Sequence, residues 1–410
     1  MGLTLCCTGC EFSTLPEAAL LRCPRCGEPL EMRGYGRPSI ATHLWPRRTL
    51  VERYAELLPA QGYYTALSLG EGFTPLVEAP GLARDLGVAR VLLKNETVNP
   101  TWSFKDRGTV VALSEALFLG ASAIGVVSTG NMAASVAAYG ARAGLPVLVL
   151  VSAETPVSKL VGISVYGPSV MRVRGDYGDL YHRSLEVGRG RVRFLNSDAP
   201  ARVEGSKTIA FEVCEQMDFR PPDWVIVPTS SGGNIRGILK GFEEMVSCGL
   251  TSTVPRMVCA QAAGCAPIYE GWKRGMNEIV PVNRPDTIAH AIANPRPPSG
   301  NAVLRRIRAA GGLCVAVDDA GIVAGQLELA QAGVFGQPEG AVPFAAARML
   351  ARDGLLKPED TVVCVVTGGG LKYPVAVEPV LPRPVDCLLE DLDECVDEWL
   401  SSAGKGRFER

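Results

Sequence analysis

The sequence predicts an α/β protein built on doubly wound parallel sheets, with a small cysteine-rich unit at its N-terminus. Short, fully apolar segments alternate with segments of helical period over most of the chain, as is typical of parallel strands that are buried on both faces. The chain has 410 residues, whereas a single domain commonly holds about 100–200. We therefore expect two large units and a small one.

The alternation begins near residue 91 and continues to residue 366. The predicted strands are 91–93, 123–127, 146–151, 170–173, 192–195, 224–227, 257–261, 313–317 and 361–366. The predicted helices are 106–119, 131–143, 156–165, 177–187, 204–217, 234–246, 320–332 and 338–351. Gly144 ends the Ala-rich helix 131–143. Acidic residues at helical spacing predict one more helix over 386–400.

Composition and charge exclude several classes of function. The 41 basic and 43 acidic residues give a net charge of −2, which offers no electrostatic footprint for nucleic acid or an acidic membrane. No apolar run approaches the roughly 20 residues that cross a bilayer, and the N-terminus lacks the order of a secretory signal. An odd count of 13 cysteines without such a signal indicates a reducing compartment. We expect a cytoplasmic protein without nucleic-acid or membrane partners.

Two cysteine pairs lie within the first 26 residues. Cys7 and Cys10 form one C-x-x-C pair, and Cys23 and Cys26 form a second pair 12 residues later. Each pair predicts a tight turn that directs two thiolates at one point, and four thiolates suit a closed, structural Zn²⁺ site. A ribbon this small needs metal for its stability, so chelation is expected to unfold it and to spare chemistry in the body. Free thiols, or a ribbon held by hydrogen bonds, are the alternative.

A lysine lies in a polar loop between a predicted strand and a predicted helix. The segment 99–108 reads Asn-Pro-Thr-Trp-Ser-Phe-Lys-Asp-Arg-Gly, which places Lys105 close to the start of the helix. An amine must lose its proton before it attacks an aldehyde, and burial beside other cations lowers the pKa of a lysine. Lys105 is therefore a candidate for a Schiff base with a cofactor. The alternative is an ordinary lysine that faces solvent.

Three more strand ends carry small polar residues. Segment 127–135 offers backbone NH groups and hydroxyls to a carboxylate, and its Asn131 could bond an aromatic hydroxyl oxygen. Segment 228–234, Pro-Thr-Ser-Ser-Gly-Gly-Asn, predicts a phosphate cradle of backbone NH groups. Segment 366–372 places the Thr367 hydroxyl where a pyridine nitrogen could meet it. Plain capped helices and Gly-rich turns are the alternatives, but open α/β sheets bind ligands at such strand ends.

These segments resemble those of threonine synthases, within fold type II of the pyridoxal-phosphate enzymes, the tryptophan synthase beta-like group. The resemblance covers about 51–380, and the cysteine pairs look like the zinc ribbon of many family members. It is carried by 69–76, 99–108, 128–135, 204–208, 227–234, 261–267 and 367–372. It implies two doubly wound parallel-sheet domains with pyridoxal 5′-phosphate in the cleft. The expected domains are a zinc ribbon (1–34), a large cofactor-binding domain (35–104 and 225–385), a small domain (105–224) and a C-terminal helix and tail (386–410).

The resemblance also implies a role for each site residue. Lys105 would be the catalytic residue, binding the cofactor and then moving protons, while Phe104 would pack against the ring. Asn131 would bind the 3-oxygen of the ring, and Thr367 would meet its nitrogen. The cofactor phosphate would lie on Ser230, Ser231, Gly232, Gly233 and Asn234. The substrate would be bound by Ser128, Thr129, Asn196, Ser197 and Arg202, whose planar guanidinium suits phosphate.

The implied activity is that of a carbon–oxygen lyase in amino-acid biosynthesis, acting as a homodimer. It would convert O-phosphohomoserine and water into threonine and phosphate. A hydroxyl at the ring nitrogen fits β-elimination more readily than γ-chemistry, and the sequence departs from the family pattern at Trp102, 230–234, 336–341 and Tyr373. The alternative is a paralogous enzyme that performs β-elimination or β-replacement on another (phospho)amino acid such as O-phosphoserine, like a cysteate synthase or an ammonia-lyase.

Overall fold

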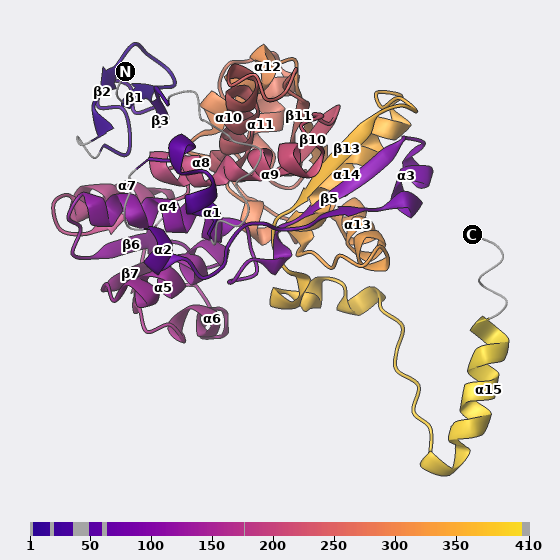
Figure 1. Cartoon of the computed structure of the whole chain (residues 1–410). Helices are drawn as coiled ribbons and strands as arrows, with labels where there is room; N and C mark the ends of the chain where they lie inside the picture. Colours follow the sequence, from indigo (N-terminus) through magenta and orange to yellow (C-terminus); the bar gives the residue numbers. More distant parts are fainter. Residues whose placement is uncertain (1–2, 17–19, 36–48, 60–63, 176, 404–410) are drawn as a thin grey trace. The chain divides into compact units, whose positions relative to one another are not determined.

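A computed structural model describes residues 3–16, 20–35, 49–59, 64–175 and 177–403 (Figure 1). The chain separates into two compact units, Met1–Pro374 and Val375–Arg410. The expected start of the large domain at residue 35 borders 36–48, which lie outside the described residues, as do 404–410 at the end of the expected tail. The four domain boundaries expected from the sequence stay predictions.

The strands of the described residues form three sheets. The antiparallel N-terminal sheet has the order β2-β1-β3, from Ser13–Thr14, Thr4–Cys7 and Leu30–Arg33. The large sheet has the order β12-β11-β10-β13-β5-β4, from Leu313–Val317, Arg256–Ala262, Trp224–Pro228, Thr361–Val366, Arg90–Asn95 and Leu76–Glu78. The small sheet has the order β8-β7-β6-β9, from Ser169–Val173, Val147–Ser152, Ile124–Val127 and Arg193–Phe194.

Helices connect the strands and cover the sheets. The helices up to β9 are α1 Leu50–Arg53, α2 Tyr64–Leu67, α3 Pro80–Leu86, α4 Lys105–Phe118, α5 Asn131–Ala143, α6 Val161–Ser164 and α7 Tyr177–Gly188. The later ones are α8 Pro200–Ser206, α9 Thr208–Gln216, α10 Gly233–Ser247, α11 Pro267–Lys273, α12 Gly300–Ala309, α13 Asp319–Gln331, α14 Pro338–Arg352 and α15 Leu392–Ala403. Short 3₁₀ turns include η3 Glu96–Val98, η4 Val157–Leu160, η5 His290–Ile292 and η9 Leu389–Asp391.

The structure confirms the α/β class and corrects details of the elements. The large sheet is mixed, because the short edge strand β4 runs antiparallel to β5. This strand was not predicted from the sequence. The expected helix 204–217 is divided at Lys207 into α8 and α9, and the expected helix 156–165 is divided into η4 and α6. The expected helix 386–400 begins only at Leu392, after the turn η9.

The core lies on both faces of the large sheet, as expected for parallel strands that are buried on both sides. The central strand β13 alternates its side chains between two apolar clusters: Val363 and Val365 join one, and Val362, Cys364 and Val366 join the other. Helix α14 packs across β10, β11, β12 and β13 (Figure 1). This packing fixes the strand ends that carry the predicted polar loops.

Four buried ionic side chains connect β5 and η3 to α4 and α9. Arg107 Nε lies 2.6 Å from Glu96 Oε2, and Arg107 Nη1 lies 2.6 Å from Glu212 Oε1. Lys94 Nζ lies 2.7 Å from Glu212 Oε2. All four side chains are at most 3% exposed. Because Arg107 follows Lys105 by two residues, this cluster anchors the start of α4, where the candidate lysine lies.

The C-terminal unit contains the amphipathic helix α15. Its apolar residues Leu392, Val396 and Trp399 follow helical spacing and are exposed within the unit. None of the helices in the described residues is both long enough and apolar enough to span a membrane.

Candidate active site and metal centre

A pocket lies where strand ends of the large sheet meet helix starts from both sheet regions. Its walls come from the start of α4, the start of α5, the segment 228–234 after β10, helix α8, the turn η5, the start of α14 and the end of β13. It is lined by Phe104, Lys105, Asn131, Ser197, Arg202, Ser206, Pro228, Thr229, Ser230, Ser231, Gly232, Asn234, Ile235, Ala291, Ile292, Glu339 and Thr367. Segments far apart in the sequence therefore meet in one cavity, at the strand ends where ligands bind open α/β sheets.

Lys105 is the first residue of α4 and projects into this pocket. Its Nζ lies 4.3 Å from the centroid of the Phe104 ring. Enclosure in the pocket and the nearby Arg202 guanidinium lower the pKa of Lys105 to about 7, against an opposing effect of Glu339. A large fraction of the amine is therefore unprotonated near neutral pH, as a nucleophile toward an aldehyde must be.

The loop that contains Lys105 is tied to the end of β13. Phe104 N donates to Thr367 O at 3.0 Å, and Gly369 N donates to Trp102 O at 2.9 Å. Lys372 Nζ donates to Thr101 O at 2.8 Å. These bonds place Thr367 on the wall beside the lysine.

The loop 230–234 follows β10 and opens α10. Gly232 has a φ of 94°, in the left-handed region that favours glycine. Gly233 packs so closely on the neighbouring loop that an added Cβ would lie 2.2 Å from Ser197 O. Asn234 is half-buried, its amide atoms are shielded from solvent, and neither Oδ1 nor Nδ2 has a hydrogen-bond partner among the described residues. A helix N-terminus with a glycine turn and unsatisfied polar atoms fits a bound phosphate.

Replacing Gly233 with alanine is expected to displace this loop, because the new methyl group would overlap Ser197 O. Overpacking of this kind costs about 1–3 kcal/mol. We expect weaker cofactor binding, measured by titration of the apoprotein, and a lower Tm. The matched control is Gly81→Ala in α3, where an added Cβ meets nothing within 4 Å. Equal cofactor affinity in the Gly233 variant and the control would contradict this account of the loop.

Asn131 is the first residue of α5 and lines the pocket. Its Nδ2 donates to Gln337 Oε1 at 2.6 Å, which holds the amide against the residue that precedes α14. Nearby on the sequence, Ser128 Oγ accepts from Gly130 N at 3.3 Å. Ser128 and Thr129 do not line the pocket in the part of the chain that the structure describes.

Arg202, on α8, is buried and lines the same pocket as Lys105. Its Nη1 donates to Thr109 Oγ1 at 2.8 Å, and its Nη2 donates to Lys105 O at 3.1 Å. Burial lowers the pKa of Arg202 to about 10, so the guanidinium stays charged at neutral pH. These bonds orient a cation at the start of α4, where it can meet an anionic ligand.

The segment 196–198 gives one residue to the pocket. Ser197 lines it, whereas Asn196 is buried outside the lining, where its Oδ1 accepts from Val127 N at 3.1 Å. The position of Asn196 therefore indicates a structural contribution between β6 and the loop after β9. Gly233 does not line the pocket either, and it packs against the backbone of Ser197.

Glu339 is a pocket residue that the sequence reasoning missed. It lies in the first turn of α14, is 5% exposed, and its Oε1 has no hydrogen-bond partner in the described part of the chain. Burial raises the pKa of Glu339 to about 7, although Lys105 and Lys372 oppose the shift. The sequence did offer a signal for Glu339. Segment 336–341 departs from the family pattern, and in this chain an acidic residue directly follows Pro338. Ser206 and Ile292 were also missed.

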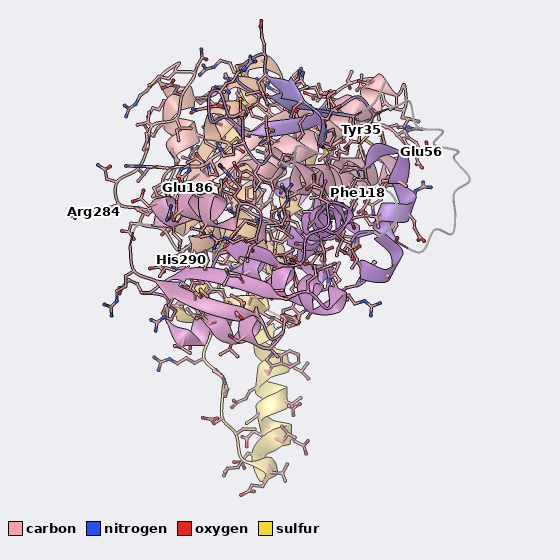
Figure 2. The ribbon with its side chains drawn as sticks, turned by 90° about the vertical axis from the view of Figure 1, so that its left-hand side faces the viewer. Tyr35, Glu56, Phe118, Glu186, Arg284 and His290 are labelled. Atoms are coloured by element: carbon pink, nitrogen blue, oxygen red, sulfur yellow. The ribbon has the colours of Figure 1, made fainter. Side chains whose placement is uncertain are left out.

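The edge of this region carries His290, labelled in Figure 2, at the start of η5. Its Nε2 lies 3.2 Å from the Tyr373 hydroxyl oxygen. The two following residues, Ala291 and Ile292, line the pocket. Tyr373, one of the departures from the family pattern, therefore lies close to a wall of the pocket.

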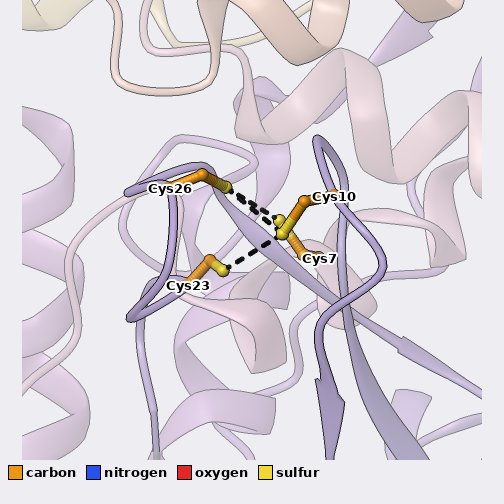
Figure 3. Close-up of side chains that lie close together, drawn as sticks. All are labelled: Cys7, Cys10, Cys23 and Cys26. Carbon is orange, nitrogen blue, oxygen red and sulfur yellow. Dashed lines mark hydrogen bonds between the residues drawn. The ribbon is translucent and has the colours of Figure 1, made fainter.

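The four cysteines of the two C-x-x-C pairs converge as the sequence predicts (Figure 3). Their sulfur atoms all lie within 4.8 Å of one another. Measured pairs are Cys7 Sγ–Cys26 Sγ at 3.4 Å, Cys10 Sγ–Cys23 Sγ at 3.7 Å and Cys10 Sγ–Cys26 Sγ at 3.6 Å. A tetrahedral Zn²⁺ with Zn–S bonds of about 2.3 Å requires sulfurs about 3.8 Å apart. The donor set and its spacing therefore fit zinc.

The fold and the pocket together define an enzyme of the pyridoxal-phosphate-dependent class, with a lysine amine, a glycine turn at a helix start and polar side chains at strand ends in one cavity. The family model for "Pyridoxal-phosphate dependent enzyme" matches residues 67–368, and the chain belongs to this family.

Curated relatives place the chain among threonine synthase-like lyases. It is 39% identical to the threonine synthase of Methanocaldococcus jannaschii over 338 residues, which are 82% of this chain and 84% of the relative. It is 36% identical to the threonine synthase of Methanosarcina acetivorans over 397 residues, which are 95% and 96% of the two chains. The resemblance noted in the sequence is confirmed.

Solved structures confirm the type II fold. Maize serine racemase aligns with a TM-score of 0.61 at 21% identity, covering 81% of this chain and 93% of that one. Diaminopropionate ammonia lyase from Escherichia coli aligns with a TM-score of 0.65 at 18% identity, covering 77% and 90%. At these identities the likeness concerns the fold alone.

Proposed function

We propose that this enzyme converts O-phosphohomoserine and water into threonine and phosphate. The observation that carries the proposal is the position of Arg202, a buried cation that donates to the backbone of Lys105 and lines the same pocket. A phosphate group on a substrate can bind this guanidinium through its planar donors. The identity to curated threonine synthases over most of the chain supports the same substrate.

The proposed roles are those that the family resemblance implies. Ser230, Ser231, Gly232, Gly233 and Asn234 hold the cofactor phosphate, Phe104 packs on the ring, and Asn131 and Thr367 meet its 3-oxygen and nitrogen. Ser197 joins Arg202 in binding the substrate. Ser128, Thr129 and Asn196 lie outside the pocket lining, and their predicted contacts with substrate stay predictions of the sequence. Bound pyridoxal phosphate supplies an electron sink for charge that develops at the substrate.

The chemistry of the protein itself centres on the Lys105 amine. With a pKa lowered to about 7, the amine can remove a proton from the α-carbon of the substrate and donate a proton in a later step at the same pH. Arg202 fixes the phosphate leaving group and stabilises the charge that it carries away.

We propose that Cys7, Cys10, Cys23 and Cys26 bind one structural Zn²⁺. The four thiolates complete a tetrahedral shell and leave no position for substrate. A homodimer, a cytoplasmic location and a phosphorylated substrate as the main partner stay predictions of the sequence.

A second candidate function is β-elimination or β-replacement on another amino acid, such as O-phosphoserine. The observation that favours it is Glu339, which adds a buried carboxyl to the pocket. A charged carboxyl at this point repels any phosphate group, so it favours the ammonia-lyase-like form of this alternative, which acts on an amino acid without a phosphate. The neutral form of the carboxyl would reduce this effect.

Incubation with alternative substrates separates the two functions. Purified enzyme is supplied in turn with O-phosphohomoserine, O-phosphoserine and threonine, while phosphate, ketoacid and amino-acid products are followed. Threonine and phosphate formed in equal amounts from O-phosphohomoserine support the first proposal. Turnover of O-phosphoserine without turnover of O-phosphohomoserine supports the second.

Replacing Arg202 with alanine is expected to raise the KM for O-phosphohomoserine. Hydrogen bonds to charged groups contribute about 1.5–3 kcal/mol, which corresponds to a KM increase of about 10-fold to 150-fold. Steady-state kinetics measure the change, and the visible spectrum shows whether the cofactor stays bound. The control is Arg183→Ala, which removes a largely exposed arginine on α7. An unchanged KM would remove Arg202 from the substrate site.

A further inference from the structure

We propose that the N-terminal ribbon holds two loops of the active site in position. Arg22 is the positioning residue that connects the ribbon to both loops, at Asp198 and at Pro298. This inference rests on the proposed location of the cofactor phosphate in the loop 230–234. Arg22 directly precedes Cys23, one of the four clustered cysteines, and its Nε donates to Gly27 O at 2.7 Å. A metal at the cysteine cluster would therefore fix the backbone that carries Arg22.

Arg22 reaches from the ribbon to two separate segments of the body. Its Nη1 forms an ion pair with the Asp198 carboxylate, and its Nη2 donates to Pro298 O at 2.7 Å. The Arg22 side chain is 17% exposed, and that of Asp198 is 2% exposed. A charged hydrogen bond in such a shielded position is geometrically specific and stronger than one in open water.

The first segment leads to the wall of the pocket. Asp198 follows Ser197, which lines the pocket and whose carbonyl oxygen packs against Gly233. The second oxygen of Asp198 accepts from the Tyr181 hydroxyl at 2.7 Å. Displacement of Asp198 would therefore move Ser197 and remove the surface against which Gly233 rests.

The second segment leads to the phosphate cradle itself. Pro298 precedes Ser299, whose backbone N donates to Ser231 O at 3.0 Å. Arg236 supports the same residue, because its Nη1 donates to Ser299 Oγ at 3.0 Å while its Nη2 donates to Leu30 O of the ribbon at 3.3 Å. The ribbon thus contacts the support of the cradle through two arginines.

The ribbon packs on the body over a continuous apolar surface. Leu5, Leu30 and Met32 are at most 2% exposed and belong to the same hydrophobic cluster as residues of α8 and α10. Lys240 Nζ also donates to Met32 O at 2.6 Å. The sequence led us to expect that chelation would spare the chemistry of the body. These contacts lead to the different expectation that loss of the ribbon loosens the active-site loops.

The test uses the full-length, zinc- and cofactor-loaded enzyme and the variant Arg22→Ala. Zinc per chain is measured by elemental analysis, and the cofactor dissociation constant by the loss of visible absorbance on dilution. Residues in a coupled network change affinity by about 2-fold to 30-fold, so we expect the cofactor to bind more weakly by a factor in this range. The matched control is Arg25→Ala, which removes an exposed arginine of the same ribbon that lies over the Phe12 ring.

A second variant approaches the same bridge from the body. Asp198→Asn leaves the ribbon intact and weakens the ion pair with Arg22, while Tyr181→Phe keeps that ion pair and removes a hydroxyl that contacts both Asp198 and Arg22. We expect Asp198→Asn to weaken cofactor binding more than Tyr181→Phe does. If Arg22→Ala loses its zinc, the comparison of Asp198→Asn with Tyr181→Phe tests the role of the Arg22–Asp198 contact with the ribbon still folded.

The outcomes separate this inference from the proposed function. Parent-like cofactor affinity in both Arg22→Ala and Asp198→Asn, together with weakened affinity in Gly233→Ala, would overturn the role of Arg22 and leave the phosphate loop in place. Parent-like affinity in Gly233→Ala as well would place the fault in the proposed phosphate site.

Discussion

Lys105→Ala is expected to remove the visible absorbance of the bound cofactor and to lower kcat by about 100-fold to 10,000-fold, the contribution of a positioned proton-transfer group. The physical reason is that, among the described residues that line the pocket, no second lysine is available to replace it. Its Nζ lies over the Phe104 ring with a pKa lowered to about 7, which suits both attack on an aldehyde and later proton transfer. Absorbance spectra and steady-state kinetics of the cofactor-supplemented variant measure both effects.

Two further lysine variants control this experiment. Lys372 donates to the Thr101 carbonyl beside the same loop, and burial lowers its pKa to about 8, so it is the strongest competing amine. Lys372→Ala is expected to keep the coloured, attached cofactor. Lys357→Ala, at an exposed position, should match the parent enzyme in both measurements. Colour that persists without Lys105 and disappears without Lys372 would reassign the attachment site.

The strand ends could be predicted from local sequence. An apolar run followed by glycine and hydroxyl residues marks the point where a buried strand leaves the sheet, as at 228–234 and 366–370. The same logic places Lys105 and Asn131 at helix starts, as the structure has them. The spacing of the four cysteines was likewise enough to predict their cluster, because each C-x-x-C turn is a local structure.

Contacts between distant segments could not be predicted in this way. Arg202 meets the backbone of Lys105 from 97 positions away, and the family resemblance alone suggested that it belongs to the site. Arg22 meets Asp198 from 176 positions away, and no local pattern identifies that partner. Glu339 was missed because an acidic residue in the first turn of a helix is ordinary there, and only the tertiary fold buries it in the pocket. The strand β4 was missed because it is a short edge strand with three partly or fully exposed residues.

The buried ion cluster beneath Lys105 provides a test of what holds the site together. Glu212 accepts from Lys94 Nζ at 2.7 Å and from two nitrogens of Arg107 at 2.6 and 2.7 Å. It also accepts from the backbone N of Phe73 at 2.7 Å, which ties in the loop before β4. Since removal of one partner leaves buried charges uncompensated, Glu212→Gln is expected to lower the free energy of unfolding by about 3–5 kcal/mol. Urea denaturation at neutral pH measures this loss.

The pH dependence identifies the charge, and not the shape, of Glu212 as the cause. Burial alone would raise the pKa of Glu212, but Arg107 and Lys94 outweigh it and lower the pKa to about 2, whereas the unfolded chain titrates near about 4.3. The stability from this carboxylate is therefore present above about pH 4.3 and lost as the pH falls toward 2, where parent and variant should converge. The control Glu78→Gln breaks an exposed pair with Arg90 and should cost at most about 1 kcal/mol. A Glu212 variant as stable as this control at neutral pH would show that the cluster does not anchor α4.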